Sequence, residues 1–240
     1  MPSEPLRLAL VGYGKMGRVL EQLAPGMGLE VVLKLDEHNN KDGTGLTAEN
    51  FRGVDVAIDF SIPAVVANNA VRLAEIGVDT VVGTTGWLGE IDRVQAAVEQ
   101  AGTGFVHGAN FSIGVNAFYR IVAAASEIFR RADEYDAAAW EAHHKMKKDA
   151  PSGTMLRLLD VMRESGFDRP IDVAHNRVGY VPGTHQISFD SEADTIELRH
   201  TARSRVGFAR GALRAARWVH GRKGFYEFSA IWEQTLGGAG

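Results

Sequence analysis

Cysteine is absent from this chain of 240 residues. Disulfide bonds, thiolate catalysis and cysteine-ligated zinc sites are therefore excluded. The chain also lacks an excess of one charge sign, because 26 basic residues stand against 30 acidic ones and the formal net charge is −4. Proteins that bind nucleic acid usually carry a basic excess, so the overall charge gives no indication of nucleic acid as a partner.

Long apolar runs are missing as well. No run of about 18 apolar residues occurs, so the sequence predicts no transmembrane helix. The N-terminus passes directly into the short run LRLALV, without the long apolar segment of a signal peptide. Hydrophobic residues still make up 45% of the chain, which is enough to pack a core. We therefore expect a soluble, cytoplasmic protein with one large domain or two smaller ones.

Short apolar runs alternate with helical patterns in the first half of the chain. This half contains predicted strands over 6–11, 29–36, 54–60, 78–83 and 103–108, and predicted helices over 18–24, 63–77 and 90–102. Such alternation is typical of a doubly wound parallel sheet, so the fold class is α/β with a Rossmann-type domain.

The pattern changes after residue 111. A long helix is predicted over 114–132, a helix from Ser152, two strands within 184–202 and a helix over 207–221, whereas the segment YDAAAWEAHH fits either a strand or a helix. The second half therefore indicates a smaller α+β domain, with a boundary near residues 110–112.

Glycines in VGYGKMGR lie between the first predicted strand and helix. Gly12, Gly14 and Gly17 give the spacing G-x-G-x-x-G. One glycine permits the tight turn, one lets the backbone approach a pyrophosphate, and one lets the helix pack on the strand. The motif alone also fits an ordinary tight turn, but its place between a strand and a helix favours dinucleotide binding.

Asp36 follows the second predicted strand, where an acidic residue can bind a ribose diol. Glu37 comes next, and no arginine lies in residues 35–41. Acidic groups there repel a 2′-phosphate, so NADH should be preferred over NADPH. Lys34 and Lys41 are near enough that NADPH stays possible.

The loops GTTG (83–86) and GANFSIG (108–114) follow later strands of the same sheet. Ligands of open α/β sheets bind at the carboxyl ends of the strands. Small residues at these positions allow a nicotinamide or ribose to lie against the backbone, although plain glycine turns have the same composition.

The stretch EAHHKMKKDAPSGT (141–154) concentrates histidine and lysine before a sudden change to Pro-Ser-Gly-Thr. A solvated surface loop is one interpretation. A metal site is another, but adjacent histidines project differently, so we predict no metal. The third is proton transfer, since histidine exchanges protons near neutral pH. Ser152 is a good N-cap, so the amides of Gly153 and Thr154 open a helix and form an anion site.

These residues resemble one family, the 4-hydroxy-tetrahydrodipicolinate reductases (dihydrodipicolinate reductases) of lysine and diaminopimelate biosynthesis. The resemblance covers essentially the whole chain. It depends most on E-A-H-H-x-x-K-x-D-A-P-S-G-T, and is supported by further motifs: VGYGKMGR, DFS, GTTG, NFSIGVN, RVGYVPGTH and HTARSR.

The resemblance implies a role for each matched position. His143 would donate a proton, Lys147 would assist it, His144 would contact the substrate, and Gly153 and Thr154 would bind a substrate carboxylate. The implied cofactor contacts are Gly12, Tyr13, Gly14, Lys15, Met16, Gly17, Asp36, Gly83, Thr84, Thr85, Gly108, Ala109, Asn110 and Phe111.

The resemblance also implies a domain organisation and an oligomer. Residues 1–111 and 209–240 would form the dinucleotide-binding domain, and residues 112–208 a mixed-sheet domain for substrate binding and assembly of a homotetramer. The reaction would pass a hydride from NAD(P)H to a small cyclic dicarboxylate. Neither nucleic acid nor membrane is expected as a partner.

Two other hypotheses share some of these features. An NAD-dependent dehydrogenase acting on an amino acid such as aspartate would have the same two domains, but it does not explain HHKMKKDAPSGT. An NAD(H)-responsive regulator would normally carry a basic DNA-binding module, and the chain has no spare domain for one.

Overall fold

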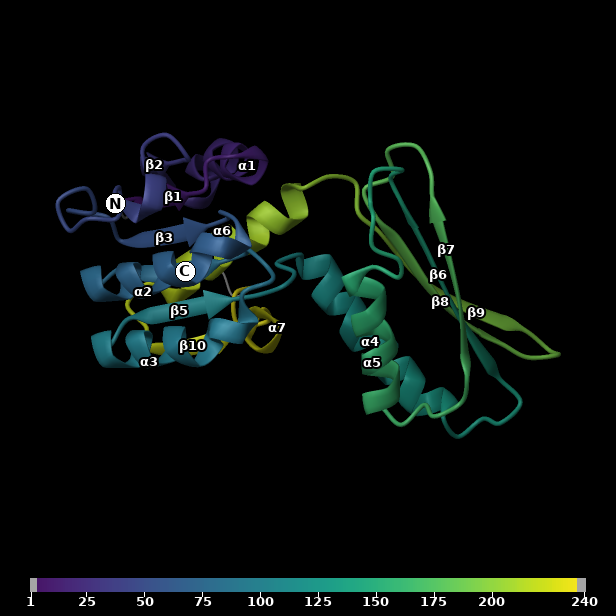
Figure 1. Cartoon of the computed structure of the whole chain (residues 1–240). Helices are drawn as coiled ribbons and strands as arrows, with labels where there is room; N and C mark the ends of the chain where they lie inside the picture. The colour runs from purple at the N-terminus through teal and green to yellow at the C-terminus, as the bar shows by residue number, and fades with distance from the viewer. Residues whose placement is uncertain (1–3, 237–240) are drawn as a thin grey trace. The chain divides into compact units, whose positions relative to one another are not determined.

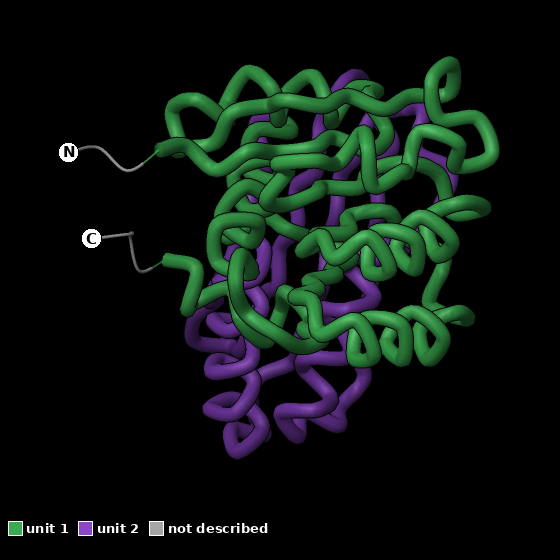
Figure 2. The backbone as a smooth tube through the Cα atoms, turned by 90° about the vertical axis from the view of Figure 1, so that its left-hand side faces the viewer, with its two compact units in different colours: residues 1–113, 205–240 green, residues 114–204 purple. Residues whose placement is uncertain are grey.

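A computed structural model describes residues 4–236 of the chain. The chain forms two compact units, one of residues 1–113 with 205–240 and the other of residues 114–204 (Figure 2). The backbone thus leaves the first unit after residue 113 and returns to it at residue 205. The dinucleotide-binding and substrate-binding roles of these segments stay predictions.

The first unit is built around a six-stranded sheet in the order β10-β5-β4-β3-β1-β2, in which every neighbouring pair is parallel (Figure 1). Its strands are β1 (Leu6–Val11), β2 (Leu29–Leu35), β3 (Val56–Asp59), β4 (Asp79–Val82), β5 (Gly104–His107) and β10 (Gly224–Glu227). The predicted doubly wound parallel sheet is confirmed. The edge strand β10 was not predicted.

Helices cover both faces of this sheet. They are α1 (Lys15–Leu23), α2 (Pro63–Ile76), α3 (Ile91–Ala101), α6 (Val206–Val219) and the short α7 (Phe228–Ile231), with single 3-10 turns η1 (Pro25–Met27), η2 (Lys41–Gly43) and η3 (Leu88–Glu90). Every residue of β3 is buried, which requires cover on both sides. Helix α2 packs against α3 and β4, and α6 packs against α1, β4 and β5.

No helix in residues 4–236 is long and apolar enough to cross a membrane.

The second unit has a four-stranded mixed sheet in the order β7-β6-β8-β9. Its strands are β6 (Asp136–His143), β7 (Ile171–Arg177), β8 (Thr184–Asp190) and β9 (Thr195–Thr201), and its helices are α4 (Ile113–Phe129) and α5 (Gly153–Glu164). β6 is parallel to β7 and antiparallel to β8. Phe118, Val122, Met155, Leu158 and Phe189 lie in the core between the helices and one face of the sheet. The predicted α+β domain with antiparallel strands is confirmed, with β7 as an unpredicted addition.

The segment that fitted both strand and helix is the strand β6. Its alanines alternate, with Ala137 and Ala139 buried and Ala138 exposed, because successive side chains of a strand point to opposite faces. Glu141 and His143 continue the buried series. The alternation therefore brings a carboxylate and an imidazole to the helix-covered face, at the C-terminal end of the strand.

Candidate active site

The glycine loop lies between β1 and α1. Gly12 has a φ of +85°, and a Cβ there would lie 2.5 Å from the backbone of Phe60 and Ser61, so the position requires glycine. A Cβ on Gly14 would meet nothing within 4 Å, which leaves open space beside the backbone at the start of α1. Gly17 is packed, because its Cβ would lie 3.1 Å from Gly12 O. The three glycines therefore serve three different needs.

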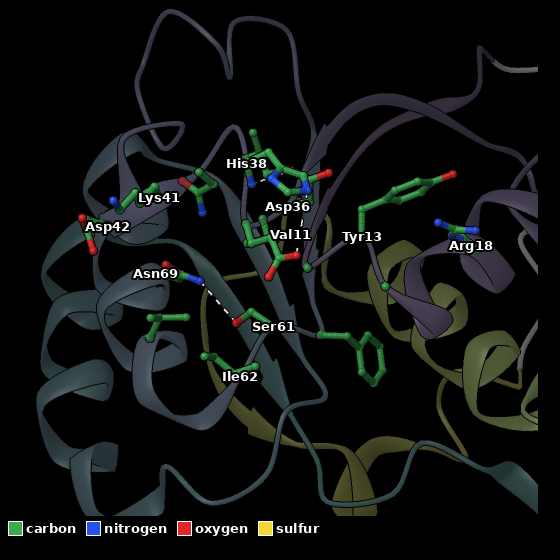
Figure 3. A pocket seen from close by; sticks show the side chains of 17 residues that line it. Val11, Tyr13, Arg18, Asp36, His38, Lys41, Asp42, Ser61, Ile62 and Asn69 are labelled. Carbon is green, nitrogen blue, oxygen red and sulfur yellow. Dashed lines mark hydrogen bonds and ion pairs between the residues drawn. The ribbon is translucent and has the colours of Figure 1, made fainter.

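A cavity of about 550 Å³ opens beside this loop. Tyr13 and Arg18 lie on one side of it, and Lys41, Asp42 and Asn69 lie on the opposite side (Figure 3). Its remaining wall comes from the ends of β1, β2 and β3, the loops that follow them and the start of α2: Val11, Gly12, Gly14, Leu35, Asp36, Glu37, His38, Asn40, Phe60, Ser61, Ile62 and Val65. The size and the mixed lining suit a nucleotide.

A second cavity of about 460 Å³ continues from the first, because Gly14, Phe60 and Ser61 line both. It is completed by Lys15, Met16, Pro63, Gly83, Thr84 and Thr85. The two cavities together form a groove, hereafter the dinucleotide groove, along the carboxyl ends of β1 to β4. Ligands of open parallel sheets bind at this edge.

Among the residues that the structure describes, those of the loop 108–111 do not line either cavity. Phe111 is 2% exposed and packs against Phe60 and Phe228, with ring centroids 6.4 and 4.6 Å away. Asn110 Oδ1 accepts a hydrogen bond of 2.9 Å from Ser112 N. Gly108 is buried and Ala109 is exposed. Phe111 thus supports Phe60, which lines both cavities, and direct contacts of this loop with a cofactor stay a prediction.

Asp36 caps its own loop. Its Oδ1 accepts hydrogen bonds from His38 N at 2.9 Å and Asn39 N at 3.3 Å. The amide of His38, followed by that of Asn39, holds the pKa of Asp36 below its usual value. All these bonds reach Oδ1, so Oδ2 can accept from a ligand in the groove.

Lys34 forms an ion pair with Glu21 and not with Asp36. Its Nζ lies 3.0 Å from Glu21 Oε1 and 5.1 Å from the centroid of the Tyr13 ring, and the Tyr13 hydroxyl donates to Glu21. Lys34 is not among the residues that line the groove, whereas Arg18 and Lys41 are. Arg18 was missed as a groove residue, although it is the last residue of VGYGKMGR and lies one turn into α1.

The second unit holds a separate cluster of polar side chains around Glu141. Glu141 is fully buried and accepts hydrogen bonds from Ser152 N at 3.0 Å, from the Ser152 hydroxyl and from Arg177 Nη2 at 2.8 Å. Burial on its own would raise the pKa of Glu141, but the bonds from Ser152 and Arg177 outweigh it and hold the pKa below the usual value. Glu141 is therefore ionised at neutral pH.

His143 and His185 face this carboxylate. His143 Nδ1 lies 3.7 Å from Glu141 Oε2, and His185 Nε2 lies 3.5 Å from the same oxygen. The two rings meet edge to face with centroids 5.1 Å apart. Gly183 lies against both, since a Cβ there would come within 3.1 Å of His143 Nε2 and 3.8 Å of His185 Cε1.

Burial lowers the pKa of His143, Lys147 and Arg177 lower it further, and Glu141 opposes them. Burial, followed by the charge of His143, lowers the pKa of His185 to about 4. Both imidazoles are therefore neutral at pH 7.

Ligand atoms of Glu141, His143 and His185 lie within 4.8 Å of one another, which is a spacing that a metal ion could use. Both oxygens of Glu141 already accept hydrogen bonds, and the Arg177 guanidinium lies 2.8 Å from Oε1. A divalent cation would have to break these bonds beside a fixed positive charge. The donor set favours a hydrogen-bonded cluster over a metal centre.

The loop from His144 to Pro151 holds Lys147 near the cluster. Lys147 Nζ lies 2.8 Å from Asp149 Oδ2, and Lys147 N donates to His144 O at 3.0 Å. Arg177 fastens the loop, because its Nη2 also donates to Asp149 O at 2.6 Å. His144 is half-buried and Lys145 is exposed. The interpretation of the stretch as a solvated surface is wrong for His143 and holds for Lys145.

Helix α5 begins directly after this loop. Ser152 is its N-cap and accepts a hydrogen bond from Met155 N at 3.2 Å, as predicted from PSGT. A Cβ on Gly153 would meet nothing within 4 Å. The space beside Gly153 is therefore open at the N-terminus of the helix, where the helix dipole favours an anion.

Glu141, Arg177, Gly183 and His185 belong to the cluster although no role was predicted for them. Their motifs were visible in the sequence, in EAHHK and RVGYVPGTH, but 36 residues separate Glu141 from Arg177 and 33 separate Ser152 from His185. Only the pairing of β6 with β7 and β8 brings these segments together.

Comparison with protein families gives two matches that together span most of the chain. The sequence model of the N-terminal part of dihydrodipicolinate reductase matches residues 6–111, and the model of its C-terminal part matches residues 114–231.

Individual relatives agree. The chain is 32% identical over 238 residues to the 4-hydroxy-tetrahydrodipicolinate reductase of Christiangramia forsetii, covering 94% of this chain and 97% of the relative. It is also 32% identical to the enzyme of the same description from Neisseria meningitidis serogroup B, covering 95% and 97%. The solved structure of a dipicolinate-bound dihydrodipicolinate reductase from Paenisporosarcina sp. TG-14 superposes with a TM-score of 0.77 at 23% identity, covering 95% of this chain and 99% of that one, and so shares the fold.

Proposed function

The chain belongs to the dihydrodipicolinate reductase family of oxidoreductases, and we propose that it reduces 4-hydroxy-tetrahydrodipicolinate to tetrahydrodipicolinate with a hydride from NADH. The family membership predicted from EAHHKMKKDAPSGT is confirmed, and the reaction belongs to lysine biosynthesis. The observation that carries the proposal for this chain is the cluster of the second unit, where His143, Lys147 and the open N-terminus of α5 occur within one strand, one loop and one helix start.

The dinucleotide groove fits the cofactor. Gly14 leaves room for a pyrophosphate at the start of α1, and the groove continues from Asp36 at one end to Thr85 at the other. We propose that Asp36 Oδ2 accepts from the adenine ribose and that Gly83 to Thr85 hold the nicotinamide half. When bound, NADH supplies the hydride, and the protein supplies binding and orientation.

The substrate is a dicarboxylate, and two features of the second unit suit its charge. We propose that the amides of Gly153 and Thr154, with the Thr154 hydroxyl, bind one carboxylate, and that His144 and the Lys147 ammonium contact the ring and the second carboxylate. Addition of a hydride to one ring carbon requires a proton at the adjacent carbon, with loss of water from the 4-hydroxy compound. His143 and Lys147 carry this proton transfer.

The charge of the groove favours NADH. Asp36 and Glu37 both line it at the end of β2, and an anionic wall repels a 2′-phosphate. Glu21 holds Lys34 through an ion pair of 3.0 Å. Arg18 and Lys41 line the same cavity, so NADPH is the slower alternative substrate that the groove still admits.

A coupled assay tests the reaction and the preference together. The substrate is generated enzymatically in the same assay, and oxidation of NADH or NADPH is followed by the absorbance of the reduced cofactor. We expect turnover with both cofactors and a higher kcat/KM with NADH. Absence of turnover with either cofactor, in a protein that binds NADH, would overturn the proposed function. Equal kcat/KM values would overturn only the preference.

We further propose that the chain forms a homotetramer in the cytoplasm. Helices α4 and α5 cover one face of the mixed sheet, and the opposite face carries the exposed Ala138 and the half-buried Trp140 and Ser188. Light scattering coupled to size-exclusion chromatography gives the mass, and a value at the monomer mass of 26.0 kDa would contradict the assembly.

A further inference from the structure

A single carboxylate oxygen lies at the centre of the cluster in the second unit. Glu141 Oε2 accepts from the Ser152 hydroxyl and lies 3.7 Å from His143 Nδ1 and 3.5 Å from His185 Nε2. These groups come from β6, β8 and the start of α5. His185 has no assigned role, although it is only 4% exposed and its ring touches that of His143.

The Ser152 hydroxyl fixes which atom of His185 carries the proton. A hydroxyl donates one hydrogen bond and accepts two. The Ser152 hydroxyl donates to the ionised Glu141, and it accepts from Met155 N at 3.2 Å. His185 Nε2 lies 3.1 Å from the same oxygen and therefore has to donate the remaining bond.

The second nitrogen of His185 agrees with this arrangement. Nδ1 is buried and has no hydrogen-bond partner among residues 4–236. A neutral imidazole carries one proton, and the bond to Ser152 assigns it to Nε2, so Nδ1 is unprotonated. All the bonding capacity of the Ser152 hydroxyl is then used, and its direction is determined from three sides.

We propose that His185 is a positioning residue for His143: by donating from Nε2 to the Ser152 hydroxyl, it directs that hydroxyl at Glu141 and so holds Glu141 Oε2 facing His143 Nδ1. The inference builds on the proposed function, because it assigns a further residue to the same site. The same hydroxyl caps α5, so the bond also links the orientation of His143 to the helix start that we propose for the substrate carboxylate.

A purely structural role for His185 makes a different prediction. A ring that only fills space can be replaced by phenylalanine, which has a similar shape but no N–H. Glutamine lacks the ring and fills less volume, but it keeps an amide N–H donor near the position of Nε2. Higher kcat in His185→Gln than in His185→Phe would support the positioning role. Higher kcat in His185→Phe would contradict it.

The experiment compares His185→Phe and His185→Gln in the full-length protein. We expect His185→Phe to lower kcat by about tenfold to a hundredfold, because a small displacement of a catalytic group has an effect of this size. KM for NADH should stay unchanged. His185→Gln should recover most of kcat. His200→Gln is the matched control, since His200 is paired with His185 across β8 and β9 and its ring faces Phe118. We expect this control to keep wild-type kcat.

Ser152→Ala supplies a second readout that is valid even if His185→Phe does not fold. It removes the hydroxyl through which His185 is proposed to act, so Ser152→Ala alone should lower kcat about as much as His185→Phe. Adding His185→Phe in the Ser152→Ala background should lower kcat no further. All rates are measured well below the melting temperature of each variant.

Three results would overturn the positioning role. They are wild-type kcat in His185→Phe, an equal loss of kcat in His185→Gln and His185→Phe, or independent losses of kcat from Ser152→Ala and His185→Phe. Each of these requires a wild-type protein that turns over the substrate. A wild-type protein without turnover contradicts the proposed function instead, so the two failures are distinguishable.

Discussion

The dinucleotide groove and the Glu141 cluster are built in opposite ways. The groove depends on backbone, with open space beside Gly14 and a glycine turn that excludes any side chain at Gly12. The cluster depends on side chains, with Glu141, Ser152 and His185 each more than nine-tenths buried and bonded to one another. The groove is therefore shaped by glycines that lack a side chain, and the cluster is shaped by hydrogen bonds between buried side chains.

The difference matters for how each site fails. A groove lined by backbone tolerates a substitution if the new side chain points away from it. It loses ligand binding when a new side chain occupies the space of the ligand. A buried polar cluster fails when one partner is removed, because the remaining groups lose their hydrogen bonds in a site that water does not reach. Substitutions in the two regions should therefore separate loss of binding from loss of chemistry.

The largest effect is expected in the cluster. His143→Gln and Lys147→Ala should each lower kcat by about a hundredfold to ten-thousandfold, the usual contribution of a positioned proton-transfer group. The dissociation constant for NADH, measured by fluorescence titration, should remain at the wild-type value because these residues belong to the other unit. Wild-type kcat in both variants would contradict their assignment, and Lys145→Ala, at an exposed position of the same loop, is the control expected to remain active.

The glycine loop offers a matched pair in the groove. Gly12→Ala should reduce the free energy of unfolding by about 4 kcal/mol, because alanine is unfavourable at a φ of +85° and its Cβ would lie 2.5 Å from Phe60 C. Gly14→Ala should leave the free energy of unfolding unchanged, because its Cβ meets nothing within 4 Å, and should instead weaken NADH binding. Denaturant unfolding and NADH titration measure the two quantities.

The contrast between these two variants is the useful result. If Gly14→Ala unfolds as readily as Gly12→Ala, the space beside Gly14 is not free for a ligand. If Gly14→Ala binds NADH as tightly as the wild type, the pyrophosphate does not approach that position.

The free energy of unfolding should fall at acid pH because His185 is buried in its neutral form. The pKa of His185 falls from 6.5 to about 4 on folding, so the unfolded chain binds more protons between these values. The free energy of unfolding is therefore highest above pH 6.5 and should fall by about 3 kcal/mol from this group as the pH approaches 4. His185→Gln should lose that part of the pH dependence, whereas the carboxylates titrate equally in both proteins. Parallel stability curves for the two proteins, from pH 7 to 4, would contradict the neutral buried ring.

Local sequence patterns predicted most of the first unit but only part of the cluster. The strands β1 and β3 are short apolar runs closed by turns, and the glycine spacing indicates its own turn. β10 escaped prediction because Gly224–Glu227 is a short, half-exposed edge strand that pairs with the distant β5. β7 escaped because its exposed outer face removes the apolar signal.

The candidate residues of the second unit were predicted where they are contiguous in sequence and missed where they are not. Local reasoning on EAHHKMKKDAPSGT predicted the start of α5, which is confirmed, whereas His143 and Lys147 were named through the family resemblance and their roles stay predictions. His185 lies on β8 and Arg177 on β7, and each reaches Glu141 only after strand pairing. No local pattern records which distant side chains a buried carboxylate will bind, since tertiary packing decides it.

The smallest expected effect lies at the end of the groove, at Asp36, which carries a negative charge and the oxygen Oδ2 that we propose for the ribose. Asp36→Asn keeps an oxygen that can accept from His38 N and Asn39 N, so the loop should keep its fold. It removes one negative charge from a wall that also contains Glu37, Arg18 and Lys41. The ratio of kcat/KM for NADH to that for NADPH should therefore fall by about tenfold, equivalent to about 1.4 kcal/mol. Glu21→Gln is the companion variant, because it releases Lys34 without altering the groove lining, and a further shift toward NADPH would show that the ion pair restrains the lysine. An unchanged ratio in Asp36→Asn would mean that Glu37, and not Asp36, sets the preference.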